Sequence, residues 1–442
     1  MKYHFISIGG SIMNNMAIAM HLKGHQVSGS DDEIFEPAKS NLAKYGLLPD
    51  KTGWQAEKIT SDIDTVILGM HAKSDNPELL RAQELNLNIV SFPEFIYQNS
   101  LNKKRVVIGG SHGKTTVTSM ILHVLKVLNI DADYLVGAKI PSYDVMVKIT
   151  DEAELLVVEG DEYLSSALDL RPKFHLYHPH IALLTGIAWD HFNVFPTFEF
   201  YLEQFKIFID TIEPKGSLVY FDQDKNLQNF ASTTSNNINK IPYDTPDYYV
   251  DNNIFKIRFN NKEYPLKIAG RHNMQNLLGA MKVCNEIGIS SEDFLSAITT
   301  YSGAAKRMEL IKDDGKNIIY RDFAHAPSKV DATVNAIREQ YPIKKIAAIF
   351  ELHTYSSLNK DFIGQYKNTL KSADTRIVFF DPHALELKRL PMLNFDDVSE
   401  AFGDEIIVIN DAKLLEKEIQ KAKKENEVLL MMSSGNFGGI NF

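Results

Sequence analysis

Residues 109–116 combine glycine, hydroxyl and lysine side chains in an order suited to binding a nucleoside triphosphate. They are Gly109-Gly110-Ser111-His112-Gly113-Lys114-Thr115-Thr116. An apolar run at 106–108 precedes them and an amphipathic run at 117–128 follows, which predicts strand, loop and helix. Such a loop directs backbone N–H groups at a phosphate, with Lys114 on the terminal oxygens and Thr115 on Mg²⁺. The alternative is a glycine turn with an exposed lysine, which the flanking strand and helix disfavour.

Acidic residues follow the next strongly apolar run, at 155–158. Glu159 opens the segment Glu159-Gly160-Asp161-Glu162, at the carboxyl end of a predicted parallel strand, where α/β folds bind ligands. A hard cation between phosphates needs oxygen ligands, so Glu159 and Thr115 are the predicted Mg²⁺ ligands. His191, in the pair Asp190-His191, is a candidate for a second metal or a phosphate. The competing interpretations are a solvated acidic turn and a structural histidine.

Three further segments supply amides and charges that a phosphoryl-transfer site needs. Asn273 and Asn276, in Gly270-Arg271-His272-Asn273-Met274-Gln275-Asn276, are candidates for adenine contact; the alternative is a helix cap with a polar helix face. Arg307, in Lys306-Arg307-Met308-Glu309, is a candidate to stabilise charge on the transferred phosphoryl group. Asp322 and His325, in Tyr320-Arg321-Asp322-Phe323-Ala324-His325-Ala326-Pro327, are candidates to orient nucleotide or substrate.

The elements that must position these groups alternate between strand and helix. Predicted strands at 5–8, 26–28, 65–68 and 88–90 alternate with helical patterns, which predicts a parallel sheet. The polar residues 99–105 are interpreted as a linker. The second region contains a polar insertion at 226–261 and closes after helices at 273–287 and 293–299. Apolar runs at 318–320, 346–350, 376–380, 406–409 and 428–432 predict a third region. We expect three α/β domains, at 1–100, 101–304 and 305–442.

Composition restricts the class of protein. The chain has 442 residues, 44% of them hydrophobic, and a formal net charge of -10. This charge argues against a broad nucleic-acid or anionic membrane surface. The single cysteine, Cys284, excludes an internal disulfide and lies in an apolar helical pattern, so we expect a buried thiol. No apolar run approaches the length of a membrane span, and we expect a cytoplasmic protein without membrane insertion.

These motifs, in this order and over essentially the whole chain, resemble those of the ATP-dependent Mur ligases, which join an amino acid or peptide to a UDP-N-acetylmuramyl carboxylate. The resemblance implies a Rossmann-like UDP-binding domain, a central P-loop ATPase domain with a parallel sheet, and a carboxyl-terminal Rossmann-like domain that binds the incoming amine. It implies ATP, Mg²⁺ and an acyl phosphate intermediate. Lys114 and Arg307 would hold the γ-phosphate, and Thr115, Glu159 and His191 would organise magnesium.

The motifs and the resemblance together predict three sets of binding residues. The ATP set is Gly110, Ser111, His112, Gly113, Lys114, Thr115, Thr116, His272, Asn273, Asn276, Arg307 and Asp322. The UDP-sugar set is Gly9, Gly10, Ser11, Ser30, Asp31, His71 and His112; a structural loop role for His71 is equally compatible. The peptide set is Glu351, His353, Tyr355, Ser356, Ser434 and Phe437. The catalytic set is Lys114, Glu159, His191, Arg307, Asp322 and His325.

The choice of amine depends on finer similarities within the family. Ser111-His112 and the opening Gly9-Gly10 are similar to the branch that acts directly on UDP-N-acetylmuramate, and Phe205 stands where other branches carry a carbamylated lysine. The ending, residues 432–440, favours the tripeptide L-alanyl-γ-D-glutamyl-meso-diaminopimelate over L-alanine, the alternative. A nucleotide-binding regulator without catalysis is a distant third interpretation, because Leu164, Gly186, Ala188, Arg321 and Ala326 depart from the family pattern. We expect a monomer or weak homodimer.

Overall fold

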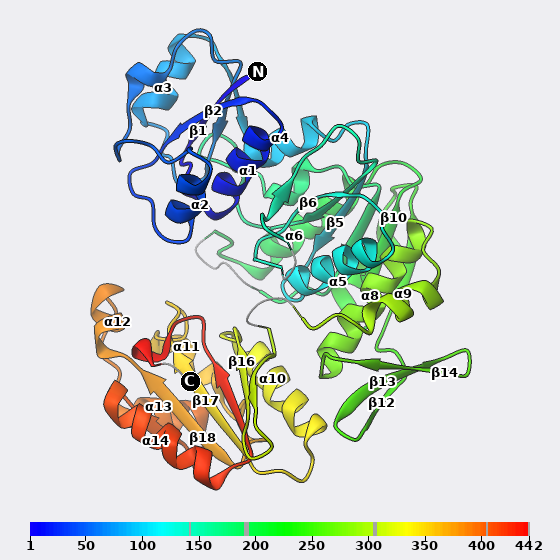
Figure 1. Ribbon diagram of the computed structural model, residues 1–442, viewed down its shortest axis with the longest axis vertical. Helices are drawn as coiled ribbons and strands as arrows, with labels where there is room; N and C mark the ends of the chain where they lie inside the picture. The colour runs from blue at the N-terminus through cyan, green and yellow to red at the C-terminus, as the bar shows by residue number, and fades with distance from the viewer. Residues whose placement is uncertain (141–142, 190–193, 304–306, 404, 441–442) are drawn as a thin grey trace. The chain divides into compact units, whose positions relative to one another are not determined.

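The computed structural model describes residues 1–140, 143–189, 194–303, 307–403 and 405–440 (Figure 1). The described chain forms two compact units, Met1–Asp244 with Asn276–Ile298, and Thr245–Gln275 with Thr299–Phe442. Three sheets are parallel apart from one edge strand in each of two of them, which confirms the predicted α/β class. The boundaries of the three predicted domains stay a prediction.

The amino-terminal sheet has four parallel strands in the order β2-β1-β3-β4. The strands are β1 (Lys2–Ile6), β2 (Gln26–Ser30), β3 (Thr65–Leu68) and β4 (Asn88–Ser91), and the helices are α1 (Ser11–Leu22), α2 (Ala38–Lys44), α3 (Pro77–Glu84) and α4 (Phe92–Gln98), with the 3₁₀ turn η1 (Ala56–Lys58). Asn76 caps α3 by accepting hydrogen bonds from two backbone N–H groups. Because the strands are parallel, the turn that follows β1 and precedes α1 lies at the carboxyl edge of the sheet, where ligands bind in such folds.

The central sheet has seven strands in the order β11-β10-β9-β5-β8-β6-β7, with only β7 antiparallel among the described pairs. Its elements are β5 (Lys104–Gly109), α5 (Lys114–Val127), β6 (Asp133–Leu135), β7 (Val147–Lys148), β8 (Leu155–Glu159), η2 (Lys173–Leu176), β9 (Ile181–Leu184), α6 (Phe198–Asp210), β10 (Ser217–Phe221), α7 (Lys225–Thr233), β11 (Asn239–Tyr243), α8 (Arg271–Glu286) and α9 (Ser291–Ile298). Because β5 pairs with β8 in parallel, the glycine loop after β5 and the acids after β8 emerge at the same edge.

The linker interpretation of residues 99–105 is wrong. Lys103 and Arg105 are buried, and β5 already begins at Lys104. The ammonium of Lys103 donates to the backbone oxygens of Thr150 and Ala153 and lies 2.8 Å from Asp133. Buried cations need such partners, so this segment is anchored to the central region.

The polar insertion at 226–261 is also more regular than predicted. It contains α7, β11, and part of a three-stranded antiparallel sheet built from β12 (Tyr248–Asp251), β13 (Ile254–Phe259) and β14 (Lys262–Leu266). Two Asn-Asn turns, at 252–253 and 260–261, join these strands with φ between 50° and 61°. Asparagine tolerates this left-handed conformation, which suits tight hairpins.

The sheet of the second unit runs β15-β16-β20-β17-β18-β19, with β15 antiparallel. Its elements are β15 (Glu309–Asp313), β16 (Ile318–Asp322), α10 (Pro327–Gln340), β17 (Ile346–Leu352), α11 (Lys360–Ile363), η3 (Gly364–Tyr366), β18 (Thr375–Phe380), α12 (Pro382–Leu387), α13 (Phe395–Phe402), β19 (Ile407–Ile409), α14 (Ala412–Glu425), β20 (Val428–Met432) and η4 (Phe437–Gly439). Alternate residues of β17 enter two cores, Ala348 and Phe350 on one face and Ala347 and Ile349 on the other. Helices thus cover both faces, which explains the uninterrupted apolar run of β17.

Two predictions from composition can be compared directly with the structure. Cys284 is fully buried in α8, as predicted, and burial raises the pKa of its thiol. Within the described ranges, no helix is both long and apolar enough to cross a membrane.

Candidate active site

The glycine loop after β5 is shaped by two glycines with positive φ. Gly110 has φ 118°, and Gly113, which caps α5, has φ 82°. A Cβ atom on Gly113 would lie 2.4 Å from Oδ1 of Asn276, so α8 approaches the loop closely. The hydroxyl of Thr185 donates to the backbone oxygen of His112, and the backbone N–H of Ser111 donates to Gly186. The loop is therefore held by hydrogen bonds to the residues that follow β9, and α8 packs close to it at Asn276.

Lys114, the first residue of α5, forms the most buried ion pair of this site. Its Nζ lies 2.5 Å from Oε2 of Glu162 and donates to the backbone oxygen of Gly110 at 2.8 Å. Burial alone would lower the pKa of this ammonium, but Glu162, followed by Asp161, outweighs it, and the pKa is raised. Lys114 is therefore held charged at the helix start, as phosphate binding requires.

The predicted magnesium ligands Thr115 and Glu159 are in contact. The Thr115 hydroxyl donates to Oε1 of Glu159 at 2.7 Å, and the backbone N–H of Gly137 donates to Oε2 at 2.8 Å. Two hard oxygen donors beside a phosphate-binding loop suit Mg²⁺, which takes its other ligands from phosphates and water. Among the described residues, no group of three or more His, Cys, Asp or Glu side chains is arranged to hold a metal. Asp190 and His191 lie outside the described residues.

A buried hydrogen-bond chain connects the loop to α6; of its members, sequence analysis singled out Ser111 but not Tyr201. The Tyr201 hydroxyl donates to Oε1 of Glu162 at 3.2 Å and lies 3.0 Å from Oγ of Ser111. The Ser111 hydroxyl also accepts the backbone N–H of Ala188. Ser111, predicted to bind ATP, thus uses its hydroxyl within the protein. The acidic run after β8 pointed to Glu162, but its pairing with Lys114 depends on the sheet order.

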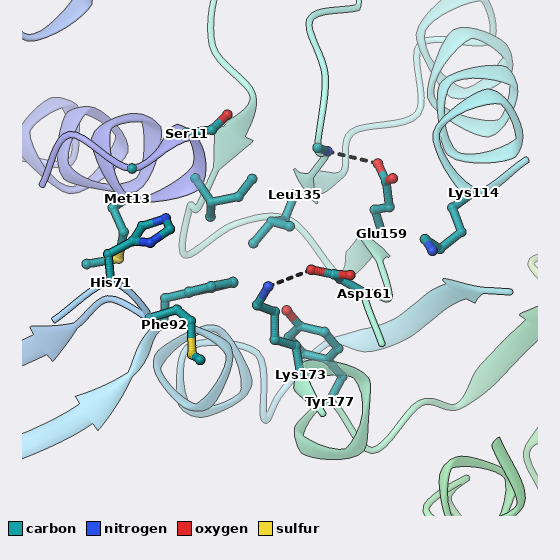
Figure 2. A pocket seen from close by; sticks show the side chains of 14 residues that line it. Ser11, Met13, His71, Phe92, Lys114, Leu135, Glu159, Asp161, Lys173 and Tyr177 are labelled. Atoms are coloured by element: carbon teal, nitrogen blue, oxygen red, sulfur yellow. Dashed lines mark hydrogen bonds and ion pairs between the residues drawn. The ribbon is translucent and has the colours of Figure 1, made fainter. Parts of the chain in front are cut away.

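A cavity of about 370 Å³ joins this phosphate site to the amino terminus of α1 (Figure 2). It is lined by Gly10, Ser11, Ile12, Met13, Met70, His71, Phe92, Lys114, Leu135, Gly137, Glu159, Asp161, Lys173 and Tyr177. The predicted UDP-sugar residues Gly10, Ser11 and His71 therefore share one cavity with Lys114 and Glu159. The start of a helix favours anions, since its backbone N–H groups are unpaired there.

Ser30 and Asp31, also predicted to bind the UDP-sugar, are buried behind the first glycine turn. Oδ2 of Asp31 accepts the backbone N–H of Gly9 at 2.7 Å, and the backbone oxygen of Ser30 accepts the N–H groups of Ser7 and Ile8. Burial, aided by Asp32, raises the pKa of Asp31 to about 6. These two residues support the turn from behind and do not line the cavity.

In the second unit, Asp322 organises the segments that carry two other predicted residues. The residue is 5% exposed, and its carboxylate accepts the backbone N–H groups of Met308 and Ala324, each at 2.7 Å. The Arg307 guanidinium lies 5.1 Å from the centre of the Phe323 ring, and Nδ1 of His325 lies 2.8 Å from the backbone oxygen of Phe323. Asp322 thus fixes the backbone at Met308 and Ala324, the neighbours of Arg307 and His325 in sequence, and its predicted role toward nucleotide or substrate stays a prediction.

The amide-rich motif divides between two roles. The Asn273 amide donates to the backbone oxygen of Ala269 at 2.8 Å, so this donor is used within the protein, and its contact with adenine stays a prediction. Asn276 lies against Gly113 in the glycine loop. Burial lowers the pKa of His272; Arg307 acts in the same direction, and Asp322 opposes it.

The predicted peptide residues separate into buried and accessible groups. Glu351 is 2% exposed and accepts hydrogen bonds from the Ser433 hydroxyl and the Phe437 N–H, and Phe437 is itself buried. These two residues fix the terminal loop, which corrects their prediction as direct peptide contacts. Tyr355 is 59% exposed, whereas His353, Ser356 and Ser434 are partly exposed.

Comparison with known proteins gives consecutive family matches along the chain. Residues 2–104 match the Mur ligase family catalytic domain, 108–284 the Mur ligase middle domain, and 306–435 the Mur ligase glutamate ligase domain. A UDP-N-acetylmuramate–L-alanine ligase of Caldicellulosiruptor bescii is 32% identical over 402 residues, covering 88% of this chain and 85% of the relative. One from Aquifex aeolicus is 27% identical, covering 98% and 95%.

Solved structures show the same fold. A UDP-N-acetylmuramate-alanine ligase of Thermotoga maritima aligns with a TM-score of 0.73 and 22% identity, covering 99% of this chain and 97% of that one. A murein peptide ligase of Psychrobacter arcticus aligns with a TM-score of 0.65 and 22% identity, with the same coverage. Together with the family matches and the phosphate site built around Lys114, these likenesses lead to one conclusion. The chain belongs to the Mur ligase family and is an ATP-dependent ligase that forms a carbon–nitrogen bond.

Proposed function

We propose that this enzyme joins the carboxylate of UDP-N-acetylmuramate to the amine of L-alanyl-γ-D-glutamyl-meso-diaminopimelate. UDP-N-acetylmuramate as the first substrate is supported by one continuous cavity that extends from the amino terminus of α1 to Lys114 and Glu159. A UDP-sugar diphosphate suits the helix start at Gly10 and Ser11, and a carboxylate on the sugar then extends toward the phosphate site.

The reaction proceeds in two steps. A carboxylate oxygen attacks the γ-phosphorus of ATP, the bond from that phosphorus to the bridging oxygen of ADP breaks, and an acyl phosphate forms. The amine nitrogen then attacks the acyl carbon, the tetrahedral intermediate expels phosphate, and the nitrogen loses a proton. Lys114 holds the γ-phosphate charge through the first step, and Arg307 adds a second positive charge. Thr115 and Glu159 would hold Mg²⁺, which would neutralise phosphate charge when bound.

Two observations bear on the amine. Phe205 is fully buried in α6, at the position where the resemblance places a carbamylated lysine in other branches, and this supports direct action on UDP-N-acetylmuramate. The terminal loop at 432–440 favours the tripeptide. L-Alanine is the second candidate, because the sequence relatives described above are named as L-alanine ligases. We also propose the domain division 1–100, 101–304 and 305–442, with the third domain binding the amine through His353, Tyr355, Ser356 and Ser434.

The test is ADP release with Mg²⁺, ATP and UDP-N-acetylmuramate, comparing the tripeptide with L-alanine. Turnover with the tripeptide alone supports the proposal. Turnover with L-alanine alone would identify L-alanine as the amine instead. Lys114→Ala is the control for chemistry at the glycine loop, with an expected loss of about 10²- to 10³-fold in kcat. Release of ADP that is independent of any amine and unaffected by Lys114→Ala contradicts both candidates.

A further inference from the structure

The cavity contains a second lysine that the mechanism above does not use. Lys173 begins η2, and its Nζ lies 2.5 Å from Oδ2 of Asp161. The centres of the Phe92 and Tyr163 rings lie 5.6 Å and 5.5 Å from this Nζ atom. Figure 2 shows its side chain on the cavity wall beside Phe92 and Tyr177, with the ammonium directed toward Asp161. Its side chain is only 12% exposed.

The backbone fixes Lys173 relative to the acidic run after β8. Its N–H donates to the backbone oxygen of Tyr163 at 3.0 Å, and the N–H of Phe174 donates to that of Asp161 at 3.1 Å. Phe174 is fully buried and stacks on Phe208 with ring centres 4.6 Å apart. A cation held this way loses little conformational freedom when it binds an anion.

The charges that line the cavity are balanced, so an anionic ligand at this position depends on the hydrogen-bond donors of Lys173. Among the described residues that line it, the lysines are Lys114 and Lys173, and the carboxylates are Glu159 and Asp161. Lys114 donates to the backbone oxygen of Gly110 in the glycine loop, and Glu159 accepts from Thr115. Both are therefore engaged beside the glycine loop. The ammonium of Lys173 has three N–H donors, and the described structure assigns one of them, to Asp161. The remaining donors are available to a carboxylate.

We propose that Lys173 binds the carboxylate of the UDP-sugar and holds it for attack on ATP. This inference rests on the proposed first substrate. The reacting carboxylate and the γ-phosphate are both anions, so their approach requires a cation on each. Lys114 serves the phosphate, and Lys173 serves the carboxylate. The substrate is thereby selected for an acidic group at the end of the cavity away from the diphosphate.

Direct binding distinguishes this role from a structural one. Titration calorimetry without ATP compares UDP-N-acetylmuramate with UDP-N-acetylglucosamine, which lacks the carboxylate. In Lys173→Gln we expect affinity for the first ligand to fall about 10- to 100-fold, the usual effect of losing a charge-assisted hydrogen bond. Affinity for the second should stay within about twofold, since it has no anion at that end. Lys173→Arg should recover most of the loss.

Lys256→Gln is the matched control. Lys256 is also a partly buried lysine paired with an aspartate, Asp251 at 2.7 Å, and lies 6.0 Å from the centre of the Tyr249 ring. It lies on β13, outside the cavity, and its substitution should change neither affinity. Melting temperatures of all variants establish that they are folded.

Three results would overturn the proposal. Equal losses for both ligands in Lys173→Gln would mean that Lys173 maintains the cavity without recognising the carboxylate. Unchanged affinity for both ligands would mean that it contacts neither. Absence of UDP-N-acetylmuramate binding in the wild-type protein would instead contradict the proposed first substrate itself, and is distinguished because it precedes any substitution.

Discussion

The Nζ atom of Lys114 lies 2.5 Å from Oε2 of Glu162, and these side chains are 14% and 1% exposed. A lysine buried without an acidic partner tends to lose its proton, because burial penalises the charged form. Glu162 reverses this tendency, and the Tyr201 hydroxyl fixes its other oxygen. The pair therefore sets both the charge and the direction of the group that we propose binds the γ-phosphate.

Replacing Glu162 with Gln keeps the side-chain size but removes the charge that raises the pKa of Lys114. Less negative charge then offsets the lowering of the Lys114 pKa by burial, so Lys114 loses its proton at a lower pH than in the wild type. We expect the alkaline limb of the kcat/KM profile for ATP to move to lower pH, measured between about pH 6 and 10. At the alkaline end, the loss in rate should be at least about tenfold.

Glu203→Gln is the control for this substitution. Glu203 is exposed on α6, the helix that carries Tyr201, and should give the wild-type profile. Superimposable profiles for Glu162→Gln and the wild type would show that Glu162 does not control Lys114.

Removing the Thr115 hydroxyl tests the magnesium site without changing its charge. Thr115→Val loses the hydrogen bond to Glu159 and one predicted oxygen ligand. We expect the Mg²⁺ concentration for half-maximal ADP release to rise about tenfold, because one hard ligand is lost. Thr115→Ser retains the hydroxyl and should stay close to the wild type. An unchanged Mg²⁺ requirement in Thr115→Val would exclude this residue from the metal site.

Asp31 should make folding stability depend on pH in an unusual direction. Its pKa is raised from 3.8 to about 6 in the folded protein, so the folded state binds the proton more tightly than the unfolded chain. This contribution to stability is present at low pH and is lost as pH rises from about 4 to 6. Asp31→Asn retains an oxygen for the Gly9 N–H and should flatten this part of the curve.

Urea unfolding at several pH values measures the effect. Asp50→Asn, at an exposed position of the same amino-terminal region, serves as the control and should leave the slope unchanged. A steeper loss of stability with rising pH in Asp31→Asn than in the wild type would contradict the assignment.

The short strands could be predicted because each is an apolar run bounded by turn residues. The run at 65–68 coincides with β3, and the run at 428–432 coincides with β20. Helix starts were less accurate: α5 begins at Lys114, not at 117, because the glycine loop itself forms the cap at Gly113. The hairpins of β12 to β14 were missed since their strands carry many polar residues, although the two Asn-Asn pairs marked their turns.

The candidate site was predictable only where its residues follow one another in a motif. Thr115 and Glu159 were paired by the chemistry of magnesium, and their contact confirms that they are neighbours. The partnership of Lys114 with Glu162 requires β5 beside β8, an order that periodicity does not specify. Lys173 was missed because its environment combines Phe92 of α4 with Asp161, which are far apart in the sequence.

Two glycines with nearly the same φ distinguish the effect of backbone strain from that of a clash in the glycine loop. Gly113 has φ 82° and Gly24 has φ 88°, so alanine is strained at both, by about 1 kcal/mol. At Gly24 the added methyl group meets nothing within 4 Å, whereas at Gly113 it meets Oδ1 of Asn276 at 2.4 Å. Gly24→Ala should therefore lower the melting temperature slightly and leave ATP binding and turnover unchanged. Gly113→Ala should displace the loop or α8 and weaken ATP binding at least about tenfold, as measured by calorimetry. If both variants bind ATP equally well, the close approach of Asn276 to the loop has no part in nucleotide binding.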